Sequence, residues 1–183
     1  MLPKVWSEMR FTKNHSETSI PGVFTGQYDY FSDLRGQIWT IHSEEGYLAK
    51  FVEDKITISN KDVLRGLHGD KETDKLISCL HGKIQLVVVD ARKNSPTRGA
   101  VETFFLSAEE PSYVFVPAGC LNGHLCLSNK CIFWYKWSQK YTGADTQETV
   151  LWNDEDLKIS WACEKPILSK RDENGSLFKE VRI

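Results

Sequence analysis

Short runs of β-branched and aromatic residues, separated by turn-forming residues, dominate the hydrophobic pattern of this chain. Such runs predict β-strands, and the 3.6-residue repeat of an amphipathic helix is scarce. Turn signals such as Asn94-Ser95-Pro96 and Pro117-Ala118-Gly119 divide the runs. Helices are expected only around residues 43–52 and 154–157. The strands are expected at residues 37–42, 56–59, 63–70, 75–80, 83–90, 101–106, 113–116, 123–127 and 131–137.

This spacing favours an all-β sandwich, barrel or jelly roll with few short helices. The run 84–89 is apolar except at Gln85, as expected for a strand covered on both faces. A further sheet or a partner subunit would provide that cover. The first thirty and last ten residues look too polar to form a core alone. We expect them to act as arms that pack across a dimer partner.

Composition narrows the class of protein. A length of 183 residues without linker or repeat predicts one domain, residues 1–183. A net charge of -2, mixed along the chain, favours neither a nucleic-acid nor a membrane partner. The N-terminus lacks an apolar signal core. Five cysteines without Cys-x-x-Cys spacing support neither a disulfide framework nor a zinc site, so we expect reduced thiols in the cytoplasm.

Candidate chemistry begins in the stretch from Val63 to Asp70, which places Arg65 and His68 on one short strand. A histidine can act as a general base near neutral pH, and an arginine can hold an anionic substrate. A structural histidine is the competing interpretation of this stretch taken alone.

Several separate stretches, in matching order over about residues 30 to 172, resemble the dTDP-4-dehydrorhamnose 3,5-epimerase family. They are Asp33-Leu34-Arg35-Gly36, Val63-Leu64-Arg65-Gly66-Leu67-His68, Lys75-Leu76, Val88-Val89-Asp90-Ala91-Arg92-Lys93-Asn94-Ser95-Pro96-Thr97, Leu106-Ser107-Ala108-Glu109, Phe133-Trp134-Tyr135-Lys136, Leu151-Trp152-Asn153-Asp154 and Pro166-Ile167-Leu168-Ser169-Lys170-Arg171-Asp172. The resemblance implies a cupin jelly-roll β-barrel that acts on a nucleotide-diphosphate 4-keto sugar without a cofactor. It also implies a homodimer in which exchanged N-terminal strands lend residues to the partner's site.

The family's roles carry over by motif. The resemblance implies that His68 is the base, that Asp172 orients and supports its imidazole, and that Tyr135 reprotonates the opposite face. Lys75 would stabilise the enolate oxygen. Arg35 and Arg65 would bind the diphosphate, for which a planar two-pronged cation is suited.

Each assignment has a structural competitor. Tyr135 could be a core residue of an aromatic strand, Lys75 a surface residue and Asp172 a solvated charge. We interpret Asp90 and Arg92 as structural, and the cysteines as core or interface residues. We also interpret His15 and His42 as structural or surface residues, and His81 as an exposed turn residue.

The chain departs from the family pattern in the residues that would recognise the substrate. Gly69 and Asp70 replace an aromatic residue and Gln after the histidine, and Gly69 is expected to leave room beside the sugar. Asn122 stands where the family carries a histidine near the substrate. Lys55 ends the stretch that replaces a Gln-x-Asn motif, and Tyr141 remains as a base- or sugar-stacking residue.

These changes predict the family reaction on a different substrate. We expect a GDP- or dTDP-linked 4-keto hexose or heptose, used for surface polysaccharide such as a capsule. A branch of the family that acts on GDP-4-keto heptoses resembles this chain in its Arg-Gly-x-His-Gly-Asp sequence and in an Asn-x-His after the proline turn.

Three other interpretations remain. A nucleotide-sugar 3,4-ketoisomerase would share much of the site. A metal-dependent cupin such as a dioxygenase needs clustered histidines and a carboxylate, and His68 has no second histidine two residues away. A non-catalytic sugar-nucleotide-binding cupin would need neither a base nor an acid. We therefore expect no metal, flavin or nicotinamide.

Overall fold

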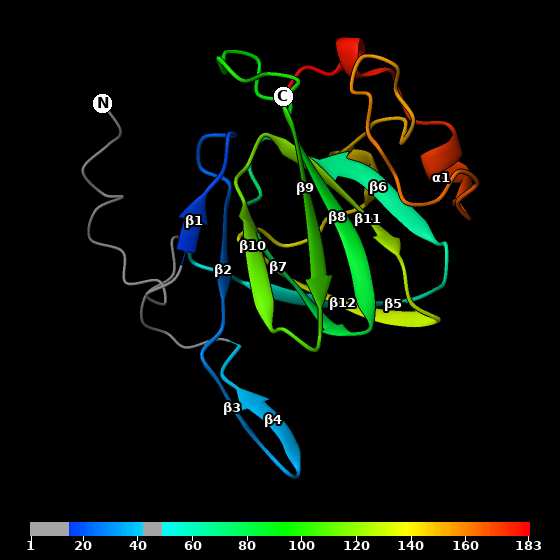
Figure 1. Ribbon diagram of the computed structural model, residues 1–183. Coiled ribbons are helices and arrows are strands. Elements are labelled where there is room, and N and C mark those ends of the chain that lie inside the picture. The colour runs from blue at the N-terminus through cyan, green and yellow to red at the C-terminus, as the bar shows by residue number, and fades with distance from the viewer. Residues whose placement is uncertain (1–14, 42–48) are drawn as a thin grey trace.

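Two antiparallel β-sheets face each other in the computed structural model, which describes residues 15–41 and 49–183 (Figure 1). The prediction of an all-β jelly roll with little helix is confirmed. The six-stranded sheet contains, in spatial order, β1 (His15–Glu17), β2 (Phe24–Gln27), β10 (Ser112–Val116), β7 (Lys75–His81), β12 (Lys130–Trp137) and β5 (Glu53–Asn60). The five-stranded sheet contains β13 (Glu148–Thr149), β6 (Leu64–Gly69), β11 (Cys120–Cys126), β8 (Lys83–Asp90) and β9 (Val101–Ser107).

A separate hairpin of β3 (Tyr30–Asp33) and β4 (Gly36–Trp39) extends away from the two sheets (Figure 1). Its apolar side chains are exposed: 61% of Phe31, 70% of Ile38 and the whole of Leu34. A projecting apolar hairpin of this kind is typical of a surface that meets another protein. The sequence pattern had predicted a strand at residues 37–42 but not the β3 strand, nor β1, β2 and β13.

Strand β8, which lies between β11 and β9, is buried on both faces, as the apolar run predicted. One face packs into the core between the sheets, where Ile84, Leu86 and Val88 meet residues of β7, β10 and β12. The other face, with Val87 and Val89, is covered by Leu157, Phe178 and Val181 of the C-terminal segment.

The expectation that a further sheet or a partner subunit covers the outer face of β8 was therefore wrong, because the C-terminal segment covers it. The chain ends were expected to be too polar to form a core alone, and their described residues instead add to the core that the sheets form. Ile20 and Val23 near one end, and Phe178 and Val181 near the other, are buried.

Gln85, the one polar residue in the run 84–89, joins the C-terminal segment to this strand. Its side-chain nitrogen donates to the carbonyl oxygen of Ser160 (2.7 Å), and its side-chain oxygen accepts from the backbone nitrogen of Ala162 (2.8 Å). Both polar atoms of a buried amide are thus paired, which removes the cost of burying them.

Within residues 15–41 and 49–183, helix is limited to α1 (Lys170–Glu173) and the 3₁₀ turns η2 (Ala144–Thr146) and η3 (Phe178–Glu180). The helix expected at residues 154–157 is wrong, because the Asp154 carboxylate accepts hydrogen bonds from the backbone nitrogens of Asp156, Leu157 and Phe178 and holds a loop. Residues 43–48 of the other expected helix lie outside the described residues, as does His42, and residues 49–52 are not helical.

Candidate active site

A cavity of about 350 Å³ lies between the two sheets and brings together most of the residues that the sequence singled out. Its volume is within the range of small-molecule sites, about 300–1,000 Å³. Strands β6 and β11 of one sheet, β5, β7 and β12 of the other, and the segment around α1 provide its walls. The lining residues are Lys55, Thr57, Arg65, His68, Lys75, Asn122, His124, Phe133, Tyr135, Trp137, Tyr141, Gln147, Ser169, Arg171 and Asp172.

A β-bulge in β6 places Arg65 and His68 in the same cavity. In a regular strand, residues three apart face opposite sides of the sheet. Here three steps along β6, from Arg65 to His68, match two steps along β11, from His124 to Asn122. The extra residue bends the strand at Gly66, whose φ of 133° is unfavourable for any residue with a Cβ. A Cβ at this position would also collide with the backbone of Gly123.

His68 and Asp172 form a close pair. His68 Nε2 lies 2.6 Å from Asp172 Oδ1, and the second carboxylate oxygen accepts a hydrogen bond from the Ser169 hydroxyl (2.7 Å). Burial acts to raise the pKa of Asp172, but hydrogen bonds from His68 and Ser169 outweigh it and lower the pKa. With Nε2–H donating to the carboxylate, Nδ1 of His68 is the nitrogen that can accept a proton.

The position of Asp172 follows from the segment that precedes it. The backbone of Ile167 pairs with β6, since Leu64 N donates to Ile167 O (3.0 Å) and Ile167 N donates to Asp62 O (2.8 Å). Ser169 then caps α1 by accepting from Asp172 N (3.2 Å). Asp172 is thereby held beside His68, although 104 positions separate the two residues in the sequence.

Lys75 lies at the floor of the cavity with 3% of its surface exposed. Its Nζ donates to Asn122 Oδ1 (2.8 Å) and to the carbonyl oxygen of His68 (3.3 Å), and it lies 5.2 Å from the centre of the Trp137 ring. Burial lowers the pKa of Lys75 to about 8, and the negative charge of Asp70 partly opposes that effect.

Tyr135 comes from β12 in the six-stranded sheet, whereas His68 comes from β6 in the five-stranded sheet. The two side chains therefore enter the cavity from opposite walls. Burial raises the pKa of Tyr135 above its ordinary value, so the phenol keeps its proton near neutral pH. A proton acceptor and a proton donor thus face each other across one space.

Four cations line the cavity: Lys55, Arg65, Lys75 and Arg171. Asp172, which is paired with His68, is the one carboxylate among the described lining residues. Lys55 Nζ also lies 4.1 Å from the centre of the Tyr141 ring. This excess of positive charge suits an anionic group such as a diphosphate.

Eight of the ten residues that the sequence predicted for the site line this cavity. Arg35 does not, because it lies on the β3–β4 hairpin with its side chain 86% exposed and paired with Asp33 (2.6 Å). Gly69 does not line it either: a Cβ there would collide with the carbonyl oxygen of Cys120, so Gly69 allows close strand packing. The idea that Gly69 leaves room beside the sugar is not supported.

Sequence reasoning missed several lining residues. Arg171 precedes Asp172, and its guanidinium donates to Thr149 Oγ1 (2.7 Å) and Ala144 O (3.1 Å). Thr57, His124 and Trp137 also reach the cavity. Strand alternation could have found Thr57 from Lys55 and Trp137 from Tyr135, because residues two apart share a face.

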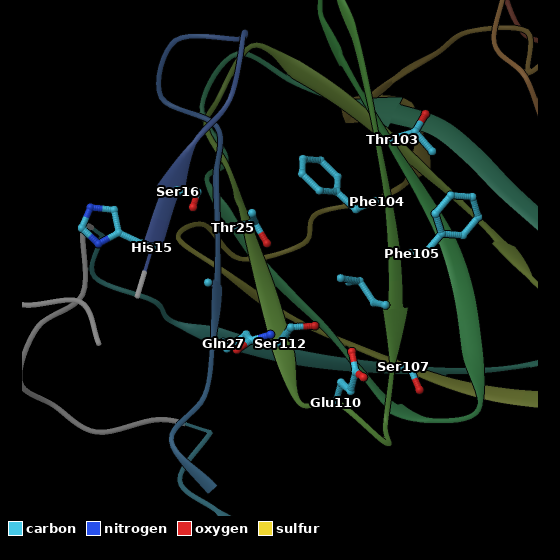
Figure 2. Close-up of a pocket in the computed structure, with 12 residues that line it drawn as sticks. His15, Ser16, Thr25, Gln27, Thr103, Phe104, Phe105, Ser107, Glu110 and Ser112 are labelled. Carbon is cyan, nitrogen blue, oxygen red and sulfur yellow. The ribbon is translucent and has the colours of Figure 1, made fainter. Parts of the chain in front are cut away.

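A more open cavity lies between β1, β2 and β10 on one side and β9 on the other. Figure 2 shows its hydroxyl-bearing residues, such as Thr25 and Ser112, together with Phe104 and Phe105. Its charged group is the carboxylate of Glu110, and no lysine or arginine is found among the described residues that line it. Its chemistry does not suit a phosphorylated ligand, and it contains none of the predicted site residues.

Two further findings concern residues 15–41 and 49–183. In these ranges no group of three or more His, Cys, Asp or Glu side chains is arranged to hold a metal ion. No helix there is long and apolar enough to cross a membrane.

Comparison with known proteins gives a consistent result. The family model for dTDP-4-dehydrorhamnose 3,5-epimerase matches residues 17–180. The enzyme of that name from Methanothermobacter thermautotrophicus is 35% identical over 182 residues, which cover 95% of this chain and 97% of the relative.

Solved structures agree with this match. The dTDP-6-deoxy-D-glucose-3,5-epimerase of Legionella pneumophila, in complex with dTDP-4-keto-L-rhamnose, has a TM-score of 0.86 and 29% identity, covering 92% of this chain and 94% of that one. A 3′-monoepimerase from Streptomyces bikiniensis, in complex with dTDP-quinovose, has a TM-score of 0.81 and 27% identity, covering 88% of this chain and 86% of that one. The chain belongs to the dTDP-4-dehydrorhamnose 3,5-epimerase family and is a nucleotide-sugar epimerase of the isomerase class.

Proposed function

We propose that the protein inverts carbon 3, carbon 5 or both in a nucleoside-diphosphate 4-keto sugar, with His68 and Asp172 as the base and Tyr135 as the acid. The observation that carries the proposal is the entry of His68 and Tyr135 into one cavity from opposite sheets. Inversion requires removal of a proton on one face of the sugar and its return on the other. Pure binding would not require this arrangement.

The proposed reaction moves protons without a net oxidation. His68 Nδ1 takes the proton from the carbon beside the ketone, and the C–H electron pair moves to form an enolate. Lys75 Nζ stabilises the negative charge that develops on the ketone oxygen. The Tyr135 hydroxyl then donates its proton to the opposite face, and the enolate collapses to the inverted ketone. Asp172 supports the imidazolium. Afterwards His68 releases its extra proton to solvent, and Tyr135 takes one up from solvent.

The direct test is incubation of the protein with GDP- and dTDP-linked 4-keto sugars in heavy water, followed by mass spectrometry. Two deuterons taken up by one substrate are expected for inversion at both carbons, and one for a single inversion. A substrate that gains neither deuterium nor an inverted centre, despite binding, would contradict the proposal.

The finer identity of the substrate is part of the proposal. The solved relatives bind dTDP-linked ligands, but this chain departs from the family pattern at Lys55 and retains Tyr141 next to it. Lys55 packs against the Tyr141 ring at the edge of the cavity. We propose a GDP- or dTDP-linked 4-keto hexose or heptose destined for surface polysaccharide such as a capsule. A panel of these four substrates, compared by kcat/KM, separates the possibilities.

A cytoplasmic location belongs to the same proposal. All five cysteines are free, and four of them are buried. Unpaired thiols are typical of a reducing compartment.

The rate is expected to fall in alkaline solution because Lys75 must be protonated to stabilise an enolate. Burial lowers the pKa of Lys75 to about 8, so kcat/KM should fall as the pH rises through that value. Tyr135 does not produce this fall, because burial raises its pKa. The Lys75→Arg variant stays protonated throughout, so any activity it retains should lose this alkaline fall. A fall near pH 8 that persists in Lys75→Arg would assign it to another group.

We also propose that the protein is a homodimer in which the β3–β4 hairpin enters the partner's site. The hairpin exposes Phe31, Leu34 and Ile38, and Arg35 lies at its turn outside its own chain's cavity. An apolar surface beside an exposed arginine suits insertion of the hairpin into a neighbouring subunit, with the arginine next to a diphosphate.

Mixing two weakened variants tests this arrangement. Arg35→Ala and His68→Asn are each expected to have little activity as homodimers. If Arg35 serves the partner's site, each mixed dimer contains one site with both native residues. Equal mixing with free exchange would then restore about a quarter of the wild-type sites. Absence of recovery, when mixed dimers are detected by native mass spectrometry, would place Arg35 in its own chain's site or outside catalysis.

A further inference from the structure

Lys75 is a buried cation whose hydrogen-bond partners are neutral. Its Nζ donates to Asn122 Oδ1 (2.8 Å) and to His68 O (3.3 Å), and none of the ion pairs among the described residues includes it. Burial of a charge without an opposite charge is costly, so a lysine in such a place tends to lose its proton. A negative charge close to Lys75 would counteract that tendency.

Asp70 is placed to provide such a charge. Strand β6 ends one residue before Asp70 and β7 begins at Lys75, so a short loop joins the two residues. The Asp70 carboxylate closes this loop into a turn, because its Oδ1 accepts from the backbone nitrogens of Glu72 (2.9 Å) and Thr73 (2.7 Å). Lys75 Nζ reaches back to the carbonyl oxygen of His68, two residues before Asp70. The negative charge of Asp70 therefore acts on the ammonium group from beside the cavity.

The surrounding hydrogen bonds keep the Asp70 carboxylate ionised. Its Oδ2 accepts from Nε2 of Gln147 (3.3 Å), a residue that lines the cavity. Burial acts to raise the pKa of Asp70, but hydrogen bonds from Glu72, Thr73 and Gln147 outweigh it and lower the pKa. Asp70 also stands where the family pattern has a neutral glutamine. This fixed negative charge is thus a feature in which the chain departs from that pattern.

The other groups near Lys75 do not supply a compensating charge. Cys120 could do so only as a thiolate, but burial raises the pKa of its thiol to about 12. Asp172 is already paired with His68 (2.6 Å), and the positive charge of Arg171 lowers the pKa of Lys75. The remaining titratable groups among the described lining residues are Lys55, Arg65, His124, Tyr135 and Tyr141. None of these types carries a negative charge at neutral pH, which leaves Asp70.

We propose that Asp70 is a positioning residue for the reaction, which places a fixed negative charge beside the cavity and thereby keeps Lys75 as an ammonium group that can stabilise the enolate. Asp70 does not line the cavity itself, so it acts through Lys75. The inference rests on the proposed function, because it takes Lys75 as the group that stabilises the enolate. Without Asp70, Lys75 would lose its proton at a lower pH, and activity would be lost earlier as the solution becomes alkaline.

Direct titration of Lys75 tests the effect of the charge without any substrate. Protein labelled with ¹³C-lysine is followed by NMR as the pH rises, and the Lys75→Arg variant identifies the Lys75 signal by its absence. The midpoint is expected at about pH 8 in the wild type and at a lower pH in Asp70→Asn, which keeps the side-chain shape without the charge. Asp70→Gln is the second variant, should Asp70→Asn fold poorly.

Asp74→Asn is the matched control for this titration. Asp74 belongs to the same loop, and its carboxylate accepts from the backbone nitrogen of Ala118 (2.8 Å). It directly precedes Lys75, and neighbouring residues of an extended chain point to opposite faces. Its replacement removes the same charge from the same loop and should leave the Lys75 midpoint unchanged.

The kinetic measurement separates this role from a structural one. Asp70→Asn should keep kcat/KM for inversion within about twofold of the wild type at about pH 6, where Lys75 is protonated in both proteins. At about pH 8.5 it should lower kcat/KM about 3- to 10-fold. In a Lys75→Arg background, where the cation cannot lose its proton, Asp70→Asn should change kcat/KM by less than about twofold at both pH values.

The inference is refuted if the variants of Asp70 leave the Lys75 midpoint in place, or if Asp74→Asn lowers it equally. It is also refuted if Asp70→Asn lowers kcat/KM equally at both pH values, or if its alkaline defect persists in the Lys75→Arg background. Failure of the proposed function would give a different result. The Lys75 midpoint would then move as expected, while neither the wild type nor the variants would exchange substrate hydrogen with heavy water at any pH.

Discussion

Replacing His68 with asparagine is expected to lower kcat about 10³-fold, within the range of contributions from a general base. Asparagine can still donate a hydrogen bond to Asp172, which lies 2.6 Å from the histidine ring, but it cannot take a proton from carbon. Deuterium uptake from heavy water into the 4-keto sugar should fall by the same factor as inversion, because both need the first proton removal.

His81→Asn is the matched control for this experiment. His81 ends β7 in an exposed position and lies outside the cavity, so its replacement should leave kcat unchanged. His68→Asn protein that retains most of its deuterium uptake would remove His68 from the role of base. Nucleoside diphosphate binding should persist in both variants, since the cationic residues are retained.

Tyr135→Phe is expected to separate proton exchange from inversion. The variant keeps the ring but loses the hydroxyl that donates a proton from the β12 wall. The proposed His68–Asp172 pair on the opposite wall can still form the enolate and return a solvent-derived deuteron to the original face. We expect inversion to fall about 10²- to 10⁴-fold, while deuterium uptake without inversion remains measurable by combined mass spectrometry and NMR.

Tyr113→Phe provides the comparison for loss of a buried tyrosine hydroxyl. Tyr113 is buried in β10 of the same sheet but does not line the cavity. Its replacement should leave inversion intact. If Tyr135→Phe inverts its substrate at the wild-type rate, another group must supply the proton.

The sequence predicted the strands well where alternation or continuous burial left a clear pattern. The predicted strand at residues 83–90 matches β8, and the predicted strand at 131–137 lies within β12. The edge strands β1 and β13 were missed, because they have three and two residues and too few apolar positions for a period to show.

The loops were harder to predict because single side chains decide them. Asp154 holds a loop at residues 154–157 through three backbone hydrogen bonds, one of which comes from Phe178 far along the chain. α1 is too short for helical periodicity, although Ser169 three positions before Asp172 is a capping signal. Long-range partners of this kind are not visible in a local pattern.

The site, too, was predicted where local motifs identify residues and was missed where its geometry depends on distant partners. Motifs identified His68, Lys75, Tyr135 and Asp172, and the structure places all four in one cavity. The bulge at Gly66 could not be read from the sequence, yet it brings Arg65 and His68 to the same side. Arg35 is a motif residue that its own chain's cavity does not contain, and we propose that it acts in the site of a second subunit.

Because the C-terminal segment covers β8, its detachment should affect stability and catalysis together. Gln85 joins this segment to the sheet through two hydrogen bonds, and the same segment carries Asp172 to His68. Detachment of this segment would expose Val87 and Val89 and at the same time separate Asp172 from His68, the proposed base. Catalytic activity should therefore be lost together with the packing of the C-terminal segment. Heating or proteolysis should not produce an active form in which this segment is detached.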